Sequence, residues 1–102
     1  MVKLVALYRR PRDPQAWMQE FLTQKEPVFR AFPGLERLEL SQPHDVLTGG
    51  DRRGAPFLML ELYFADRGAL DRALLSPEAA EIRAELIEAP GRDLSIFIAD
   101  VR

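Results

Sequence analysis

The sequence contains no cysteine and no asparagine, and it has a single histidine. Without cysteine the chain cannot form a disulfide framework, a thiol nucleophile or a zinc ribbon. The one histidine, His44, lies in a segment rich in turn residues, and a lone imidazole beside Asp45 does not make a metal site. We therefore expect no metal and no cofactor.

Long apolar runs and an excess of one charge are also missing. The 102 residues carry a net charge of -2, which argues against nucleic acid because phosphate binding needs a clustered positive field. No apolar segment is long enough to span a membrane, and the first residues lack the layout of a signal peptide. We expect a cytoplasmic protein that has neither nucleic acid nor membrane as a partner. Because no linker interrupts the chain, we expect residues 1–102 to form one globular domain.

Four segments have the residue pattern of β-strands. Each is short, apolar or alternating, and bounded by proline, glycine or charged residues. We predict strands at residues 2–8, 35–41, 57–64 and 94–101. In the second of these, leucines alternate with Arg37 and Glu39, which predicts a strand with one polar face.

Helical patterns connect these strands in two places. Asp13, followed by a proline, predicts an N-cap at the start of the first helix. Pro27 lacks the N–H that a continuing helix needs, so we predict a break near residues 24–26. After the third strand, Asp66 predicts a second N-cap, and Ser76-Pro77-Glu78 predicts that a helix restarts by the same capping.

The resulting order, βαββαβ, is typical of α+β proteins with a ferredoxin-like fold. Right-handed crossovers place the first and third strands at the centre of a four-stranded antiparallel sheet. Another α+β meander of the same elements is the alternative. Two helical units cover only one face of such a sheet, yet three of the strands are apolar on both faces. We therefore expect a homodimer in which two sheets stack face to face, as a dimeric α/β barrel.

Several segments in this order resemble the EthD family, which is named for ethyl tert-butyl ether degradation and belongs to the dimeric α/β-barrel superfamily. They are Lys3-Leu4-Val5-Ala6-Leu7-Tyr8-Arg9-Arg10-Pro11, Phe32-Pro33-Gly34-Leu35, Glu61-Leu62-Tyr63-Phe64, Ala69-Leu70 and Ser76-Pro77-Glu78. The resemblance covers nearly the whole chain and implies a ferredoxin-like fold, a dimeric barrel and a cavity between sheet and helices.

Three functions are compatible with this resemblance. The first is binding of a small apolar or aromatic molecule in the cavity. The second is a cofactor-free isomerase, lyase or monooxygenase that uses Glu61 as acid or base. The third is a structural dimer without a ligand. Most EthD-like proteins have no established reaction, so the family by itself does not decide among the three.

Glu61 is the candidate catalytic residue, because a carboxylate in an otherwise apolar central strand must be paired or protonated. We expect it on the enclosed side of the sheet with a hydrogen-bonding partner. The simpler interpretation is a structural ion pair with an arginine such as Arg9 or Arg37.

Tyr8, Met59 and Tyr63 are candidate ligand-binding residues. The two tyrosines stand at the ends of the central strands, where their hydroxyls could orient a ligand. Packing is the alternative for both, and it is the simpler interpretation for Met59. Four further aromatic residues have helical spacing and are interpreted as core rather than as ligand contacts: Trp17, Phe21, Phe29 and Phe32.

Lys25 occupies the place where the EthD family usually has a histidine. That family carries a Thr-His-Leu-Pro stretch whose histidine reaches toward the cavity, and here its proline corresponds to Pro27. We expect Lys25 to be solvated and any histidine-dependent reaction to be lost. A slip of the alignment by one or two residues is the alternative. Lys25 remains a candidate ligand contact.

Overall fold

The computed structural model describes residues 1–49, 54–88 and 94–102. Its sheet has the strand order β2-β3-β1-β4, and all neighbouring strands are antiparallel. The strands are β1 (Val2–Tyr8), β2 (Arg37–Ser41), β3 (Leu58–Phe64) and β4 (Leu94–Asp100). The predicted ferredoxin-like sheet with the first and third strands at its centre is therefore confirmed.

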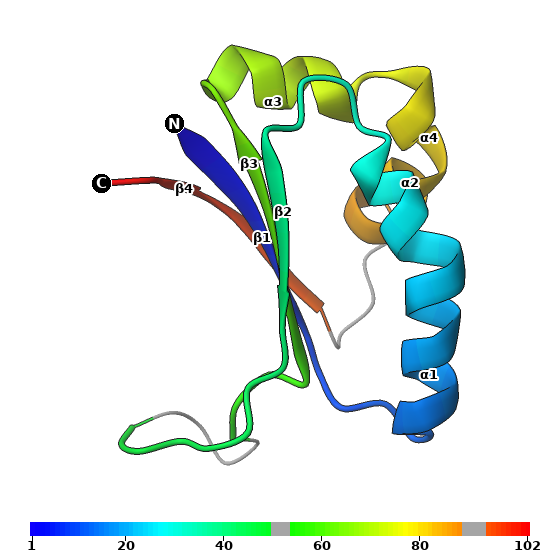
Figure 1. The fold of residues 1–102 in the computed structure, drawn as a ribbon, viewed down its shortest axis with the longest axis vertical. Coiled ribbons are helices and arrows are strands. Elements are labelled where there is room, and N and C mark those ends of the chain that lie inside the picture. Colours follow the sequence, from blue (N-terminus) through cyan, green and yellow to red (C-terminus); the bar gives the residue numbers. More distant parts are fainter. Residues whose placement is uncertain (50–53, 89–93) are drawn as a thin grey trace.

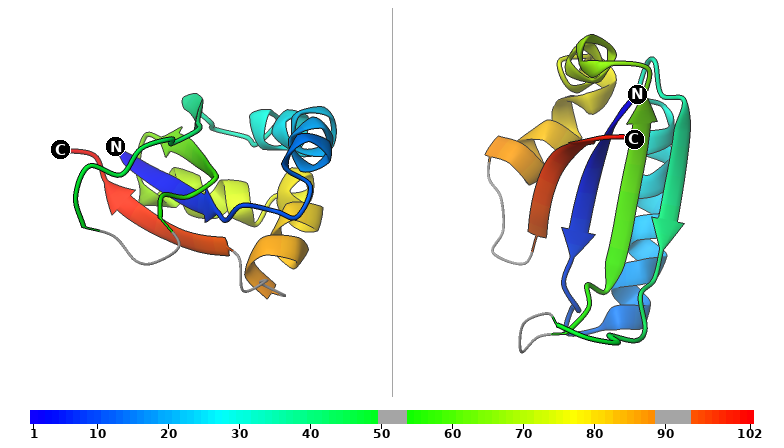
Figure 2. Two further views of the ribbon diagram at one scale, coloured as in Figure 1. Left: turned by 90° about the horizontal axis from the view of Figure 1, so that it is seen from below. Right: turned by 90° about the vertical axis from the view of Figure 1, so that its left-hand side faces the viewer.

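All helices lie on one side of this sheet (Figure 1). The first helical unit comprises α1 (Pro14–Glu20), η1 (Phe21–Lys25) and α2 (Glu26–Arg30). The second comprises α3 (Arg67–Leu74), η2 (Pro77–Ala79), α4 (Ala80–Arg83) and η3 (Ala84–Glu88). The right-hand view of Figure 2 shows the opposite face of the sheet, which none of the described helices covers. We call the two sides the helix-covered face and the helix-free face.

Both predicted aspartate N-caps are confirmed. The Asp13 carboxylate accepts a hydrogen bond from the Ala16 N–H at 3.1 Å, and the Asp66 carboxylate accepts one from the Ala69 N–H at 2.8 Å. Ser76 behaves differently from the prediction. Its hydroxyl donates to the Ala73 carbonyl at 2.6 Å and makes no capping bond to the following turn. The serine therefore provides a donor for a backbone carbonyl at the end of α3, while the next turn begins at Pro77.

The predicted break near residues 24–26 is a change of helix type rather than an interruption of the chain, and a separate short helix, α2, begins at Glu26. Residues Phe21–Lys25 form a π-helical turn, and the Glu26 N–H donates to the Phe21 carbonyl five residues earlier. This wider turn changes the hydrogen-bond register, so that Pro27 falls in the first turn of α2, where a missing N–H is tolerated. The chain thus continues from α1 into α2 as one helical unit.

The core lies between the helices and the helix-covered face. Its fully buried members include Leu60, Leu62, Phe64, Phe29 and Leu70. Side chains alternate along each strand, so Lys3, Glu61 and their neighbours two residues away face the other side. Within the described residues no helix is long and apolar enough to cross a membrane.

Candidate functional site

A cavity of about 330 Å³ lies between the helices and the end of the sheet. Most of its wall is apolar and comes from both helical units and β4: Trp17, Phe21, Phe29, Ile82, Leu86 and Leu94. Four polar residues complete the lining: Tyr8, Glu20, Lys25 and Glu85. Such a volume and such a lining, with few polar groups among apolar ones, are typical of small-molecule pockets.

Aromatic rings in mutual contact form one side of the cavity. The Tyr8 ring meets those of Trp17 and Phe21 edge to face, with centroids 5.2 and 5.4 Å apart. Trp17 and Phe21 are stacked at 5.2 Å with an interplanar angle of 17°. Phe29 adjoins Phe21 at 6.2 Å. These contacts fix the orientation of each ring, so the wall is preformed.

The polar groups of the cavity include one ion pair and one hydroxyl that has no hydrogen-bond partner among the described residues. The Lys25 Nζ lies 2.5 Å from Oε2 of Glu85, and the Lys25 side chain is only 29% exposed. Within the described part of the chain, the Tyr8 hydroxyl makes no hydrogen bond. Burial raises the pKa of Tyr8, and the charge of Glu85 raises it further, so the phenol keeps its proton at neutral pH.

Two π-helical turns bring this pair together. Lys25 ends η1, and Glu85 lies in η3, so the ion pair links the two helical units across the cavity. Single π-turns inside helices are frequent at functional sites.

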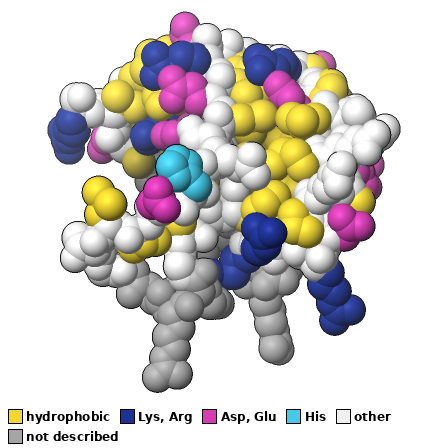
Figure 3. All heavy atoms as spheres, turned by 60° about the horizontal axis from the view of Figure 1, so that its bottom comes forward, with side chains coloured by type: hydrophobic (Ala, Val, Ile, Leu, Met, Phe, Trp, Pro, Cys, Tyr) yellow, Lys and Arg dark blue, Asp and Glu magenta, His cyan; other side chains and the backbone are white. Residues whose placement is uncertain are grey.

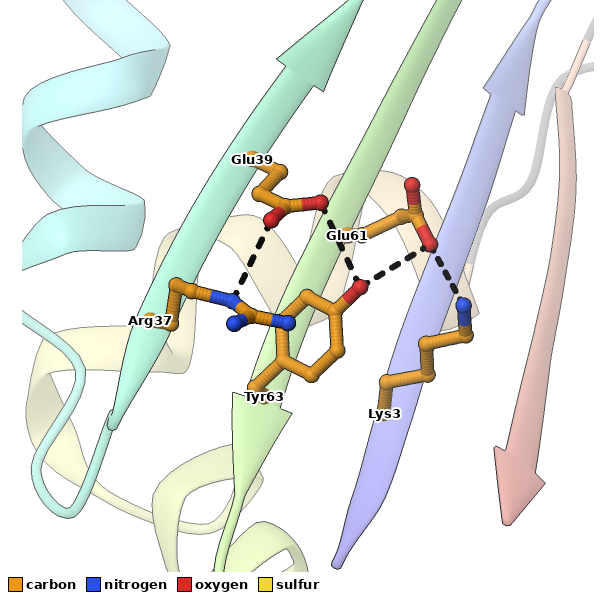
Figure 4. Close-up of polar contacts among 5 residues, drawn as sticks. All are labelled: Lys3, Arg37, Glu39, Glu61 and Tyr63. Atoms are coloured by element: carbon orange, nitrogen blue, oxygen red, sulfur yellow. Dashed lines mark hydrogen bonds and ion pairs between the residues drawn. The ribbon is translucent and has the colours of Figure 1, made fainter. Parts of the chain in front are cut away.

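The helix-free face carries a second polar cluster, which we call the polar ladder: Lys3, Arg37, Glu39, Glu61 and Tyr63 (Figure 4). The Lys3 Nζ lies 2.6 Å from Oε2 of Glu61. The Tyr63 hydroxyl lies 3.3 Å from Glu39 Oε2 and 3.4 Å from Glu61 Oε2. Every polar side chain in the ladder therefore has a partner.

Cations hold the ladder together around the buried ring of Tyr63. The Arg37 guanidinium lies 4.0 Å from the ring centroid and its Nε is 3.2 Å from Oε1 of Glu39. The hydrogen bond to Glu61 raises the pKa of Lys3, and its charge raises it further, against the lowering effect of desolvation. Two positive and two negative groups make the ladder neutral as a unit.

The structure divides the candidate residues from the sequence between two places. Tyr8 and Lys25 line the cavity, whereas Met59, Glu61 and Tyr63 lie on the helix-free face. Glu61 was expected on the enclosed side of the sheet with a hydrogen-bonding partner; it lies on the helix-free face, where its side chain is 12% exposed, and it has such a partner. That partner is Lys3 and not an arginine, because Lys3 stands diagonally opposite Glu61 on β1.

Lys25 was expected to be solvated; it lines the cavity, and its side chain is 29% exposed in an ion pair that solvent still reaches. Its ammonium turns toward Glu85 at the cavity, and no sequence signal joins two positions 60 residues apart. Trp17, Phe21 and Phe29 were interpreted as core, and they form both the core and the cavity wall. Glu20, Glu85 and the aliphatic lining residues carried no signal of their own, since charged and leucine positions on helices are common.

His44 lies on the exposed surface, with its Nδ1 atom 2.9 Å from Oδ2 of Asp45. Figure 3 shows the histidine beside an acidic side chain and a separate patch of hydrophobic side chains at the same end of the molecule. In the described residues no group of three or more metal-ligating side chains is found.

Comparison with known proteins supports the fold and the resemblance. No family model and no curated protein matches the sequence. The chain is similar to a crystal structure of an ethyl tert-butyl ether degradation (EthD) family protein from Bacillus halodurans, with a TM-score of 0.80 and 28% identity over 100% of this chain and 99% of that chain. The resemblance inferred from the sequence is thereby confirmed.

More distant structures show the same fold. A dimeric ferredoxin-like protein of unknown function from Jannaschia sp. has a TM-score of 0.65 at 15% identity, covering 98% of each chain. SnoaB, a cofactor-independent oxygenase from Streptomyces nogalater, has a TM-score of 0.62 at 19% identity, covering 99% of this chain and 92% of that one. At these identities the likeness concerns the fold alone.

Proposed function

We propose that this EthD-like chain binds a small apolar or aromatic molecule in the cavity between its sheet and its helices. The observation that carries this proposal is the aromatic wall of a cavity of about 330 Å³, in which the rings of Tyr8, Trp17 and Phe21 hold one another in place. A preformed apolar pocket binds without first having to order its walls, which leaves more of the burial energy for affinity.

The test is to fill the cavity from its half-buried side. In Leu86→Trp a larger ring occupies the space of the ligand, whereas Leu75→Trp adds the same ring at a position that is 76% exposed and outside the cavity. We expect calorimetric titration with naphthalene derivatives to give saturable binding in the wild-type chain and in Leu75→Trp, and none in Leu86→Trp. Circular dichroism checks that both variants are folded.

Two results would contradict ligand binding in the cavity. One is a wild-type chain that binds no naphthalene derivative and carries no small molecule in native mass spectrometry after gentle purification. The other is equal binding in Leu86→Trp and the wild type. The first would favour a structural dimer without a ligand, and the second would place the binding outside the cavity.

A second copy of the chain is the proposed partner of the helix-free face. Phe97 is 47% exposed there, and Val101, which follows β4, is also exposed. The ladder can be covered without leaving an unpaired charge, because its charges balance. Two such faces, related by a two-fold axis, would form the dimeric barrel. The dimeric ferredoxin-like protein from Jannaschia sp. has the same fold.

Sedimentation at micromolar concentration tests this partner. We expect twice the chain mass for the wild type and for Leu75→Asp, which adds a charge on the helical side. Phe97→Asp should sediment as a monomer. A wild-type chain that stays monomeric and soluble would contradict the dimeric barrel.

An acid–base reaction at Glu61 is the alternative function. Its carboxylate lies on the helix-free face, so a substrate would have to reach it there rather than in the cavity. Turnover that disappears in Glu61→Gln while cavity binding persists would favour this alternative.

A further inference from the structure

The Tyr8 hydroxyl is a hydrogen-bond donor for which the described residues supply no acceptor. Its ring is held between Trp17 and Phe21, which fixes where the hydroxyl lies, and none of the described residues accepts its proton. Among the described residues no fully buried side-chain polar atom lacks a partner, so water still reaches this hydroxyl. A ligand oxygen that replaces this water would accept the hydrogen bond in its place. The cavity therefore presents one fixed donor at an otherwise aromatic wall.

Charge around the cavity disfavours an anion. The only ammonium among the described lining residues is that of Lys25, and Glu85 already holds it at 2.5 Å. Glu20 contributes a second carboxylate to the same lining. Two carboxylates thus face one ammonium, so a carboxylate or phenolate ligand would meet net negative charge.

We propose that the cavity selects neutral aromatic molecules that carry a carbonyl oxygen, such as an aryl ketone, aldehyde or quinone, and that the Tyr8 hydroxyl donates to that oxygen. This inference rests on the proposed function and specifies its ligand class. The aromatic body fits against the Trp17 and Phe21 rings, and the carbonyl supplies the missing acceptor without adding charge. Tyr8 is then the residue that determines specificity.

Three probes of similar size separate these requirements. They are 2-acetylnaphthalene, which has the carbonyl, 2-isopropenylnaphthalene, which replaces the oxygen by a methylene of similar shape, and 2-naphthoate, which carries a charge. Calorimetric titration measures their affinities for the wild-type chain, for Tyr8→Phe and for Tyr63→Phe. The last variant removes the other tyrosine hydroxyl, on the helix-free face, and is the matched control.

We expect the wild-type chain to bind the ketone about 3- to 10-fold more tightly than the alkene, as one hydrogen bond provides. The carboxylate should bind more weakly than the ketone. Tyr8→Phe should abolish the preference for the ketone while leaving the affinity for the alkene unchanged, and Tyr63→Phe should behave as the wild type.

Equal affinities for ketone and alkene in the wild-type chain would overturn the inference and leave the proposed function intact. So would a ketone preference that persists in Tyr8→Phe, or tightest binding of the carboxylate. If none of the three probes binds the wild type, the proposed function itself is contradicted, and this inference with it. Because the comparison of ketone with alkene needs no variant, it remains decisive even if Tyr8→Phe fails to fold.

Discussion

The two faces of the sheet use their polar groups in opposite ways. On the helix-free face the ladder of Lys3, Glu61 and their neighbours is closed, since each charged group has a partner within the cluster. On the helix-covered face the Tyr8 hydroxyl has no acceptor among the described residues, so it can donate a hydrogen bond to a ligand in the cavity. A neutral cluster in which every charge is paired suits a surface that another copy covers, whereas a hydrogen-bond donor without a protein partner suits a ligand site.

The largest expected difference between the faces is in core packing. Leu60 is fully buried under the helices, and the adjacent Met59 faces the other side. Leu60→Ala should lower the free energy of unfolding by about 2–5 kcal/mol at every protein concentration. Met59→Ala should cost less, with a loss that grows at concentrations where two copies pair. Urea unfolding at several concentrations measures both, and equal losses would erase the distinction between the faces.

A second comparison concerns the ladder. Glu61 is only 12% exposed, so Glu61→Gln leaves the Lys3 ammonium without its carboxylate in a largely covered place. Asp71→Asn breaks an exposed pair with Arg67 on α3, worth about 0.3–0.5 kcal/mol. We expect the larger loss of stability for Glu61→Gln in chemical denaturation. A loss no greater than that of the control would mean that the ladder behaves as an ordinary surface pair.

The ion pair at the cavity should matter less for stability than for charge selection. Lys25→Met should lower the free energy of unfolding by about 1 kcal/mol or less. It should weaken binding of 2-naphthoate further, because Glu20 and Glu85 are then unopposed, and leave binding of 2-acetylnaphthalene nearly unchanged. Arg30→Met, which removes a pair with Glu26 outside the cavity lining, is the control. A sharp fall in ketone affinity in Lys25→Met would instead place the ammonium directly on the ligand oxygen.

The smallest expected effect is on the dependence of stability on pH. Burial, and then the charge of Glu85, raise the pKa of Tyr8 above its ordinary value of 10.0. The folded state therefore holds the Tyr8 proton more tightly than the unfolded state does. The resulting contribution to the free energy of unfolding is present in full below pH 10 and decreases progressively as the pH rises above 10. Up to pH 10.5 the loss should be below about 1 kcal/mol and absent in Tyr8→Phe. Denaturation curves of the two chains with identical slopes against pH would contradict the burial of Tyr8. Lys3 titrates in both chains, so its contribution cancels.

The elements that could be predicted are those whose cause is local. Strand alternation and the caps at Asp13 and Asp66 follow from neighbouring residues alone, and all are found. The π-turn of η1 was not predicted, because Pro27 was expected to interrupt the helix. Instead, a change of hydrogen-bond register accommodates the proline.

The candidate site was harder to predict, because its parts meet only through tertiary structure. Tyr8 could be proposed from its place at a strand end, but Glu85 reaches Lys25 only when the two helical units pack together. The pairing of Glu61 depended on strand register, which sets Glu61 opposite Val5 and Lys3 diagonally beside it. Aromatic spacing on the first helix predicted burial correctly and could not distinguish a filled core from one that leaves a cavity.

The central position of β1 has a consequence for the order of folding. This strand is synthesised early, yet its two neighbours are β3 and β4, which begin 50 and 86 residues after Tyr8. At about 5–20 residues per second, a ribosome needs roughly 3–10 s to reach β3 and longer to reach β4. During that interval the apolar β1 has no strand beside it, and the first helical unit has no complete sheet to pack on. The hydrophobic surface of the nascent chain is covered only when the last strand arrives, so interception by a chaperone or by another nascent copy would occur in this window.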